Sequence, residues 1–202
     1  MMDTIQSKLA ALVILATTAL GCATEAEPEE ETGETSDALG TLGDASCTPS
    51  RAAGAVPAKQ RALLDTIAWT EGTRGYGSDG YNVIVGYKYA ASCNRHPNRL
   101  VRLSSSLSST AAGRYQFLTG TWNSLGYPSF RPDDQDRAGV KLVSRRGVTL
   151  PTDRAMTATE LSNALSKLSY EWASLPPGRY GQPVKTASQV RAEYCRNARC
   201  GG

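Results

Sequence analysis

Apolar residues recur at helical spacing through most of the C-terminal part of the chain. This periodicity predicts five helices, which cover residues 57–70, 115–125, 132–146, 157–172 and 185–196. The first predicted helix has Pro57 at its start and Gly72 just after its end, residue types that typically begin and stop helices. The fourth begins with Thr157 and Glu160 at capping-box spacing and carries one apolar stripe that ends before Pro176.

One segment has a different pattern. Residues 81–87 alternate loosely between apolar and polar positions and are rich in aromatic and β-branched side chains. This composition predicts a strand in one small antiparallel sheet. The chain shows no internal repeat, and a mostly helical chain with one small sheet belongs to the α+β class.

The N-terminus carries an apolar run without a charge from Leu9 to Leu20, preceded by Lys8. The run is too short to span a bilayer, which needs about 20 residues, but it has the length of a signal-peptide core. Because the run closes with small residues before Cys22, residues 1–21 are predicted to be a lipoprotein signal peptide. Cys22 would then carry the lipid and anchor the protein in the membrane of the cell envelope, on its periplasmic or outer-membrane face. The alternative is ordinary cleavage after Gly21, which would release a secreted protein.

Charge is distributed unevenly along the chain, although the net charge is only +3. Residues 23–46 contain eight acids and no base, so we predict that residues 22–46 form a flexible acidic tether. Residues 47–202 contain 21 Lys or Arg against 10 Asp or Glu, a net charge of +11. A basic domain is typical of nucleic-acid binding, but no nucleic-acid-binding module accompanies the charge. We therefore expect no nucleic-acid partner and expect attraction to an anionic cell wall instead.

The chain has five cysteines. If Cys22 takes a lipid, four remain for two disulfides in an oxidising compartment. A helix from Cys195 to Cys200 would separate them by about 7.5 Å, which is too far for a disulfide. We therefore expect these two to pair with Cys47 and Cys93. With one histidine and no CxxC motif, the sequence predicts neither a metal site nor a cofactor.

Glu71 is the first candidate for catalysis, because it stands at the C-terminal end of the first predicted helix. The helix dipole disfavours a negative charge there, and an aromatic wall of Trp69, Tyr115 and Trp172 would desolvate the carboxyl group. Both effects raise the pKa of a glutamate, and at about 6–7 it can donate a proton to an acetal oxygen at neutral pH. On position alone, however, a glutamate that ends a helix is more often a solvated surface residue.

Several short pieces of the sequence change this interpretation. In chain order they are residues 67–73 with 80–86, His96-Pro97, residues 109–116, Gln135-Asp136, Leu150-Pro151, and residues 172–176 with 180–182. Together they resemble the phage lambda endolysin family, over residues 63–182. The resemblance implies a lysozyme-like fold for a catalytic domain of residues 47–202.

The same resemblance implies an activity. Members of this family are lytic transglycosylases, which cleave the β-1,4 bond from N-acetylmuramic acid to N-acetylglucosamine in peptidoglycan glycan strands and leave a 1,6-anhydro end. Their single catalytic glutamate matches Glu71, which would protonate the leaving oxygen and then deprotonate the 6-hydroxyl of the sugar itself. No second carboxylate is required, unlike in most glycosidases.

The polar and aromatic residues within the resembling pieces are candidates for contact with the glycan. Hydroxyl and amide groups come from Tyr115, Gln116, Tyr180 and Gln182, and an apolar face for a pyranose ring comes from Trp172 or Trp122. For each of them the alternative is packing in the core. We expect His96 to be structural and Gln135-Asp136 to serve a helix start or an internal hydrogen bond.

Two other functions stay open at this point. A muramidase would have the same fold and Glu71 but would add water with the help of a second carboxylate, Asp79 or another acid. A protein of another class would bind peptidoglycan without cleaving it. In each case we expect a monomer that works on the glycan strands of the cell wall.

Overall fold

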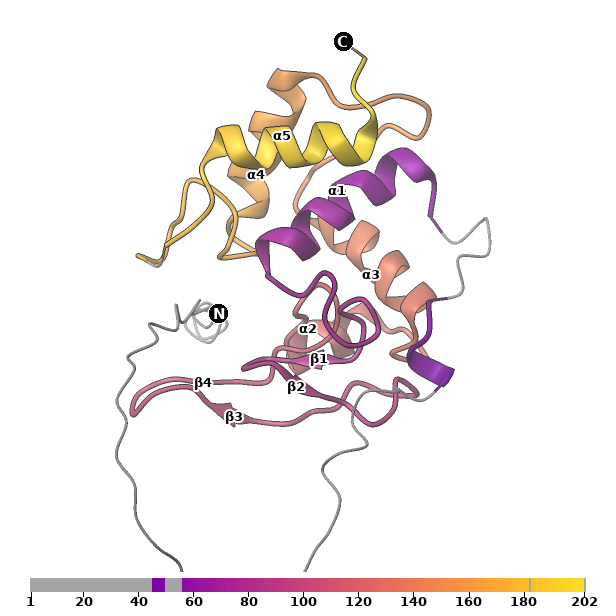
Figure 1. The fold of residues 1–202 in the computed structure, drawn as a ribbon, viewed down its shortest axis with the longest axis vertical. Coiled ribbons are helices and arrows are strands. Elements are labelled where there is room, and N and C mark those ends of the chain that lie inside the picture. The colour runs from indigo at the N-terminus through magenta and orange to yellow at the C-terminus, as the bar shows by residue number, and fades with distance from the viewer. Residues whose placement is uncertain (1–44, 50–55, 182, 202) are drawn as a thin grey trace, which may run out of the picture.

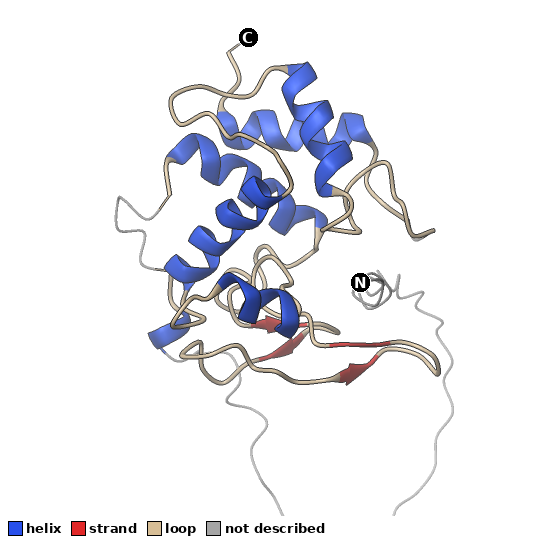
Figure 2. Ribbon diagram, turned by 180° about the vertical axis from the view of Figure 1, so that it is seen from behind, coloured by secondary structure: helices blue, strands red, loops and turns tan. Residues whose placement is uncertain are grey.

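The computed structural model describes residues 45–49, 56–181 and 183–201. Within these residues the helices are Ala58–Thr70 (α1), Thr119–Leu125 (α2), Pro132–Arg145 (α3), Ala158–Leu168 (α4) and Ala187–Ala198 (α5), and a 3-10 turn (η2) spans Ala45–Cys47. The strands are Val83–Ile84 (β1), Lys88–Tyr89 (β2), Val101–Arg102 (β3) and Ser108–Ser109 (β4). Helices α1, α3, α4 and α5 gather at one end of the molecule, and the strands lie with α2 at the other (Figures 1 and 2).

Helix α1 is central to the helical end and packs against both α3 and α5. Its Leu63, Leu64 and Ile67 are fully buried, as their spacing predicts. Burying each side chain of this size contributes about 1.5–3 kcal/mol, so the contacts hold α1 firmly. The residue that follows α1, Glu71, is thereby fixed in position.

Local signals predicted the ends of several helices correctly. At the start of α4 the Thr157 side chain accepts from the backbone of Glu160, and the Glu160 side chain accepts from the backbone of Thr157. Helix α3 begins at Pro132 with two acidic residues in its first turn, and Gly147 follows its end with a positive φ of 69°. The predicted helices near residues 57–70, 132–146 and 185–196 are confirmed with small shifts at their ends.

Two of the predicted helices are shorter in the structure. Helix α2 begins at Thr119, because Ala112 and Phe117 exchange two backbone hydrogen bonds of 3.0 and 2.8 Å and hold residues 112–117 in a tight loop. Helix α4 ends at Leu168, so Trp172 lies in the turns that follow the helix. The prediction that helices cover residues 115–118 and 169–172 is therefore wrong.

The strands form two hairpins. Strands β1 and β2 pair antiparallel with Val83 opposite Tyr89, and β3 and β4 pair antiparallel with Val101 opposite Ser109. An isolated bridge joins Ile84 to Ala112. The α+β class is confirmed, while the β structure is divided into two small sheets.

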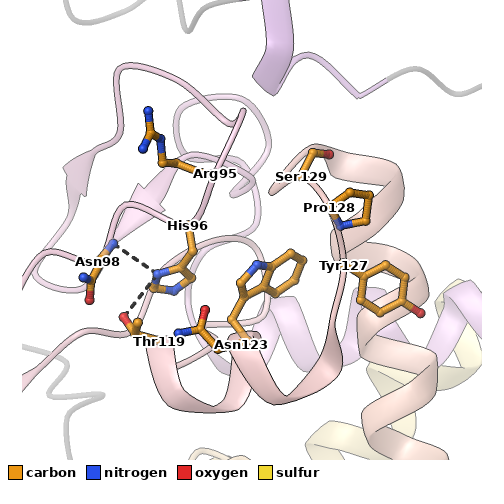
Figure 3. A pocket seen from close by; sticks show the side chains of 9 residues that line it. Arg95, His96, Asn98, Thr119, Asn123, Tyr127, Pro128 and Ser129 are labelled. Carbon is orange, nitrogen blue, oxygen red and sulfur yellow. Dashed lines mark hydrogen bonds between the residues drawn. The ribbon is translucent and has the colours of Figure 1, made fainter.

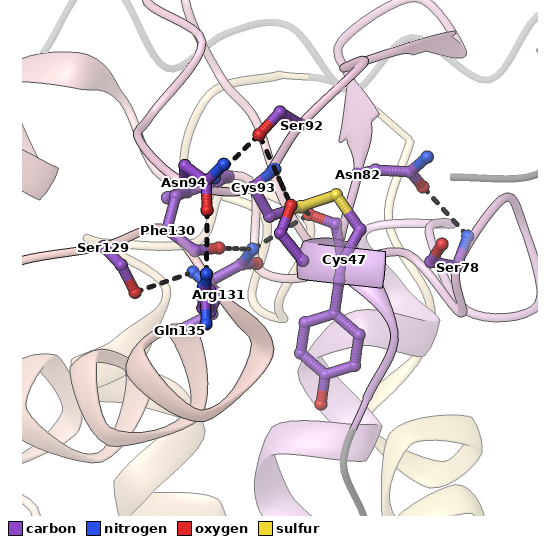
Figure 4. The surroundings of a disulfide bond; sticks show 12 residues. Cys47, Ser78, Asn82, Ser92, Cys93, Asn94, Ser129, Phe130, Arg131 and Gln135 are labelled. Atoms are coloured by element: carbon purple, nitrogen blue, oxygen red, sulfur yellow. Dashed lines mark hydrogen bonds between the residues drawn. A yellow bond between two sulfur atoms is a disulfide. The ribbon is translucent and has the colours of Figure 1, made fainter. Parts of the chain in front are cut away.

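The disulfide pairing differs from the expectation. Cys47 bonds to Cys93, with their Cα atoms 5.0 Å apart, and attaches η2 to the loop after β2 (Figure 4). Cys195 bonds to Cys200, with their Cα atoms 4.9 Å apart. Helix α5 ends at Ala198 and Arg199 has a left-handed φ of 50°, which turns the chain back until Cys200 N donates to Cys195 O. The assumption of a continuous helix between the two cysteines was wrong.

No helix in the described ranges is both long and apolar enough to cross a bilayer. The predicted signal peptide, Cys22 and residues 22–44 of the predicted tether lie outside those ranges and stay predictions. Ala45 and Ser46 belong to η2, and Ser46 Oγ accepts a 2.9 Å hydrogen bond from Cys93 N. These two residues of the predicted tether thus lie against the domain, and the boundary at residue 47 stays a prediction.

Candidate functional site

Glu71 directly follows the last residue of α1 as its C-cap. Its backbone N–H donates to Ile67 O at 2.9 Å, which continues the helical hydrogen-bond pattern, and Gly72 then turns the chain with a φ of 71°. The Glu71 side chain is half-buried. The carboxyl group is therefore held by a packed helix and is still accessible to a ligand.

Ser174 is a side-chain partner of this carboxyl group. Its buried hydroxyl lies 2.6 Å from Glu71 Oε1 and 3.0 Å from Thr70 Oγ1. The Thr70 hydroxyl in turn donates to the carbonyl of Ile67 at 2.9 Å. Three groups, from the segment after α4 and the last turn of α1, therefore form a row of hydrogen bonds that ends at Glu71.

The chain just after Glu71 is fixed to the loop at residues 113–116. Thr73 Oγ1 donates to Arg114 O at 2.6 Å, and Arg114 N donates to Gln135 Oε1 at 2.9 Å. Gln135 also donates to the carbonyls of Tyr81 and Phe130, so its amide joins α3 to both the loop and the β1 region. A Cβ on Gly113 would collide with the Gln135 side chain, which explains the glycine at that position. The expected internal role of Gln135 is confirmed.

The Arg114 guanidinium is buried and pairs with two acids. It lies 2.9 Å from Asp65 Oδ1 of α1 and 2.8 Å from Asp79 Oδ2. Burial alone lowers the pKa of Arg114, but the neighbouring Tyr115, Tyr81 and Asp79 outweigh it, and the net pKa is raised. The cation is permanent, and it ties the loop after Glu71 to the helix before it.

Asp79, the candidate for a second carboxylate, is engaged through both oxygens. Oδ2 pairs with Arg114, and Oδ1 accepts a 3.0 Å hydrogen bond from Gly75 N. These contacts close the turn at residues 75–79. They give Asp79 a structural task.

Three aromatic candidates for glycan contact lie in the core. Tyr115 is fully buried and donates to Asp136 Oδ1 at 2.6 Å, and Trp172 donates from its indole to Tyr115 O at 2.9 Å. Trp122 is buried against Phe117 and packs edge-on to another core ring. Internal acceptors satisfy the polar atoms of Tyr115 and Trp172, which fits the packing alternative for these two residues, whereas Trp122 also lines a surface pocket. Contact of these residues with sugar stays a prediction.

The buried carboxylate Asp136 organises this part of the core. Its Oδ1 accepts from the hydroxyls of Tyr115 and Tyr81, at 2.6 and 2.8 Å, and its Oδ2 pairs with Arg61 of α1. Burial and, second, the charge of Asp136 raise the pKa of Tyr115 well above its ordinary value. The hydroxyl of Tyr115 therefore stays a donor to Asp136, and the predicted internal role of Asp136 is confirmed.

The remaining glycan candidates are on the surface or outside the described residues. Gln116 is half-buried, has a positive φ of 48°, and donates to Gly113 O at 2.9 Å. Tyr180 is half-buried and follows the segment that carries Ser174. Gln182 lies outside the described residues. Gln116 and Tyr180 can still offer polar atoms to a ligand.

Sequence reasoning missed Ser174 as a partner of Glu71 and Thr70 as a partner of Ser174. Ser174 lies inside the resembling piece at residues 172–176, and it is the one hydroxyl residue there. Thr70 directly precedes Glu71. The places of Ser174 and Thr70 in the chain were the signals available in the sequence. No local sequence pattern, however, shows that Ser174, 103 positions away, contacts Glu71.

His96 lies in a different part of the molecule and lines a surface pocket with Arg95, Asn98, Thr119, Trp122, Asn123, Tyr127, Pro128 and Ser129 (Figure 3). Glu71 does not line this pocket. His96 Nε2 donates to Phe117 O at 2.9 Å, and Nδ1 accepts from Asn98 N at 3.1 Å. Burial lowers the pKa of His96 and the bond to Phe117 O only partly offsets it, so the ring is a neutral structural group, as predicted.

Comparison with known proteins adds to this geometry. A protein-family model described as Endolysin matches residues 61–200. The chain is 35% identical over 144 residues to the endolysin of Escherichia phage lambda, which covers 67% of this chain and 89% of the phage protein. It is 32% identical over 139 residues to the endolysin of Escherichia phage P2, which covers 60% of this chain and 81% of that protein.

Solved structures agree. Bacteriophage lambda lysozyme complexed with a chitohexasaccharide is similar with a TM-score of 0.64 and 34% identity, over 70% of this chain and 95% of that one. A further structure of lysozyme from bacteriophage lambda gives a TM-score of 0.60 and 32% identity, again over 70% and 95% of the two chains.

Proposed function

This chain belongs to the Endolysin family, and on that premise we propose that it is a lytic transglycosylase. The family and the similar structures confirm the lysozyme-like α+β fold and make a peptidoglycan-cleaving enzyme the expected activity. Our proposal adds the bond and the product, a β-1,4 bond from N-acetylmuramic acid to N-acetylglucosamine and a 1,6-anhydro end. The observation that carries it is Glu71, held by Ser174 at the end of a packed helix.

The proposed reaction has two proton transfers. In the first, the protonated carboxyl group of Glu71 gives its proton to the glycosidic oxygen as the bond from the sugar C1 to that oxygen breaks. In the second, the Glu71 carboxylate takes the proton of the 6-hydroxyl of that same sugar. The 6-oxygen forms a bond to C1 at the same time, which closes the 1,6-anhydro ring. Glu71 ends as it began, and the substrate supplies the nucleophile.

Ser174 fits both protonation states of Glu71. A serine hydroxyl has one proton and also accepts. When Glu71 is ionised, Ser174 donates to it over 2.6 Å; when Glu71 is protonated, Glu71 donates to Ser174, which donates onward to Thr70 at 3.0 Å. Because Thr70 itself donates to Ile67 O, its oxygen is available to accept. Ser174 is thus a positioning residue that keeps the carboxyl group oriented through both steps.

Gln116 and Tyr180 are the described residues that we propose for glycan contact, with Gln182 as a further candidate. A lysozyme of this family has been solved complexed with a chitohexasaccharide, which supports an oligosaccharide-binding surface here. The charge of +11 in residues 47–202 would favour encounter with anionic wall polymers, an attraction that weakens with salt.

The muramidase alternative requires water activated by a second carboxylate. Asp79, the named candidate for that role, is bonded through both oxygens, to Arg114 and to Gly75, which supports a structural task for it. Mass spectrometry of digested peptidoglycan separates the alternatives, because anhydro ends are one water lighter than hydrolysed ends. Hydrolysed ends alone would establish the muramidase. A folded wild-type protein that binds peptidoglycan but releases no fragments would favour a protein that only binds.

We propose export to the cell envelope or beyond, through the predicted signal peptide. Lipidation at Cys22 is tested by incorporation of labelled palmitate, with Cys22→Ala as the control. A protein without label would be secreted without an anchor. Sedimentation of the folded domain tests the expected monomer.

A further inference from the structure

Three exposed tyrosines come together near the site. Tyr76, Tyr87 and Tyr89 are 48%, 47% and 40% exposed, and only two other large apolar or aromatic residues of the described ranges are exposed. The ring centroids of Tyr76 and Tyr87 are 5.0 Å apart, with the rings tilted by 51°. Tyr89 belongs to β2, and Tyr87 to the turn before that strand. Exposed aromatic groups of this kind usually mark a binding surface.

The cluster touches the backbone next to the catalytic glutamate. The hydroxyl of Tyr87 would lie 3.0 Å from a Cβ placed on Gly72, so Tyr87 reaches the residue that directly follows Glu71. The ring of Tyr89 would lie 2.8 Å from a Cβ on Gly77, next in sequence to Tyr76. Glycine at both positions lets the tyrosines approach the chain closely, and the aromatic surface is continuous with the site.

The backbone conformation points in the same direction. Tyr87 has a left-handed φ of 56°, which is uncommon for a bulky residue, and it follows Gly86, which also has a positive φ. This turn leaves the Tyr87 ring exposed outside the core. Burial and, second, the neighbouring Tyr76 raise the pKa of Tyr87, so its hydroxyl stays neutral. The result is an apolar face with a hydroxyl directed towards the site.

We propose that Tyr76, Tyr87 and Tyr89 form a tyrosine platform that binds sugar rings of the glycan strand beyond the unit cleaved at Glu71. A pyranose ring has an apolar C–H face and polar edges, which match an aromatic face with hydroxyls at its rim. The occupant is the substrate strand because the platform ends at Gly72. This inference rests on the proposed function, since it extends the same site.

The test uses two platform variants. One is the single variant Tyr87→Ala, and the other is the double variant that carries both Tyr76→Ala and Tyr89→Ala. Each is made in the active enzyme and in Glu71→Gln, and binding of a chitohexaose to the Glu71→Gln forms is measured by calorimetry. We expect about tenfold weaker binding, corresponding to about 1.4 kcal/mol, and a higher KM with unchanged kcat. Tyr87→Trp should restore binding, and Leu100→Ala, a change at an exposed apolar residue outside the platform, should leave it unchanged.

The outcomes separate the two proposals. Unchanged affinity and KM in folded platform variants would overturn the platform while anhydro products still supported the transglycosylase. Weaker chitohexaose binding without anhydro products from the wild type would support the platform and refute the reaction. If the variants change only self-association in sedimentation and leave glycan affinity intact, the platform is also overturned. Thermal unfolding of each variant tests whether the fold is retained. Tyr87→Phe serves as a conservative second change, because it keeps the ring and removes only the hydroxyl.

Discussion

Replacing Ser174 by alanine removes one hydrogen-bond partner of Glu71, together with the bond from Ser174 to Thr70. The hydroxyl is buried and lies 2.6 Å from Glu71 Oε1, and the change removes one oxygen atom. A hydrogen bond to a charged group is worth about 1.5–3 kcal/mol. If that energy orients Glu71 in the transition state, kcat falls by about ten- to hundredfold.

The pH dependence gives a second readout. A hydrogen bond to an ionised acceptor is stronger than one between neutral groups, so Ser174 favours the ionised form of Glu71. Without the hydroxyl we expect the pH–rate profile to move towards higher pH. A purely structural role would lower the thermal stability without moving the profile.

The assay is the clearance of purified peptidoglycan, from which kcat, KM and the pH profile are obtained. Thr70→Val, which removes the next hydroxyl at nearly constant volume, should have a smaller effect because Thr70 lies 3.0 Å from Ser174 and acts through it. A folded Ser174→Ala enzyme with the kcat and pH profile of the wild type would refute the role of Ser174.

Three further predictions concern catalysis and stability. Glu71→Gln should reduce product release by about 10²- to 10⁴-fold while preserving binding to insoluble peptidoglycan; a variant with normal turnover would remove Glu71 from the reaction. The Cys47–Cys93 disulfide spans 46 residues and the Cys195–Cys200 disulfide spans five. Loop-closure entropy assigns them about 4 and 2 kcal/mol, so denaturant unfolding should show a larger loss of unfolding free energy when Cys47 and Cys93 are both changed to serine than when Cys195 and Cys200 are. The reverse order would contradict this account. The pKa of His96 is lowered in the folded protein, so the unfolded state binds a proton first as the pH falls, and the free energy of unfolding should decrease below about pH 6.5. In urea titrations at pH 7 and 5, His96→Gln should make the free energy of unfolding depend less on pH. An unchanged dependence would show that other groups cause it.

Ion pairs of a buried arginine hold the loop after Glu71 in place. Arg114 joins Asp65 of α1 to Asp79 in that loop, and its carbonyl accepts from Thr73. Removing one partner of a buried ion pair leaves the other charge without compensation, which costs more than the pair contributes when it is intact. The position of Glu71 thus depends on contacts from three segments of the chain.

The sequence by itself determined the features that act over a few residues. Pro57 and Gly72 marked the limits of the helix that ends just before Glu71, and the capping box of Thr157 and Glu160 marked the start of α4. Such signals are local hydrogen bonds and backbone preferences, so they work whatever the rest of the chain does. The short resembling pieces, with Glu71 among them, were also visible in the sequence and pointed to the family that the comparisons confirm.

Tertiary structure alone decided which of the candidate side chains reach the site. Tyr115 and Trp172 carry groups that could bind sugar, but both rings are buried in the core. Burying a large ring stabilises the fold most where its polar atom has an internal hydrogen-bond partner, as both do here. Ser174 reached Glu71 only through the packing of a segment 103 residues away. The Cys195–Cys200 bond depended on one left-handed residue, Arg199, which no periodicity could reveal. Long-range contacts depend on how whole surfaces fit together, and a linear pattern does not contain that information.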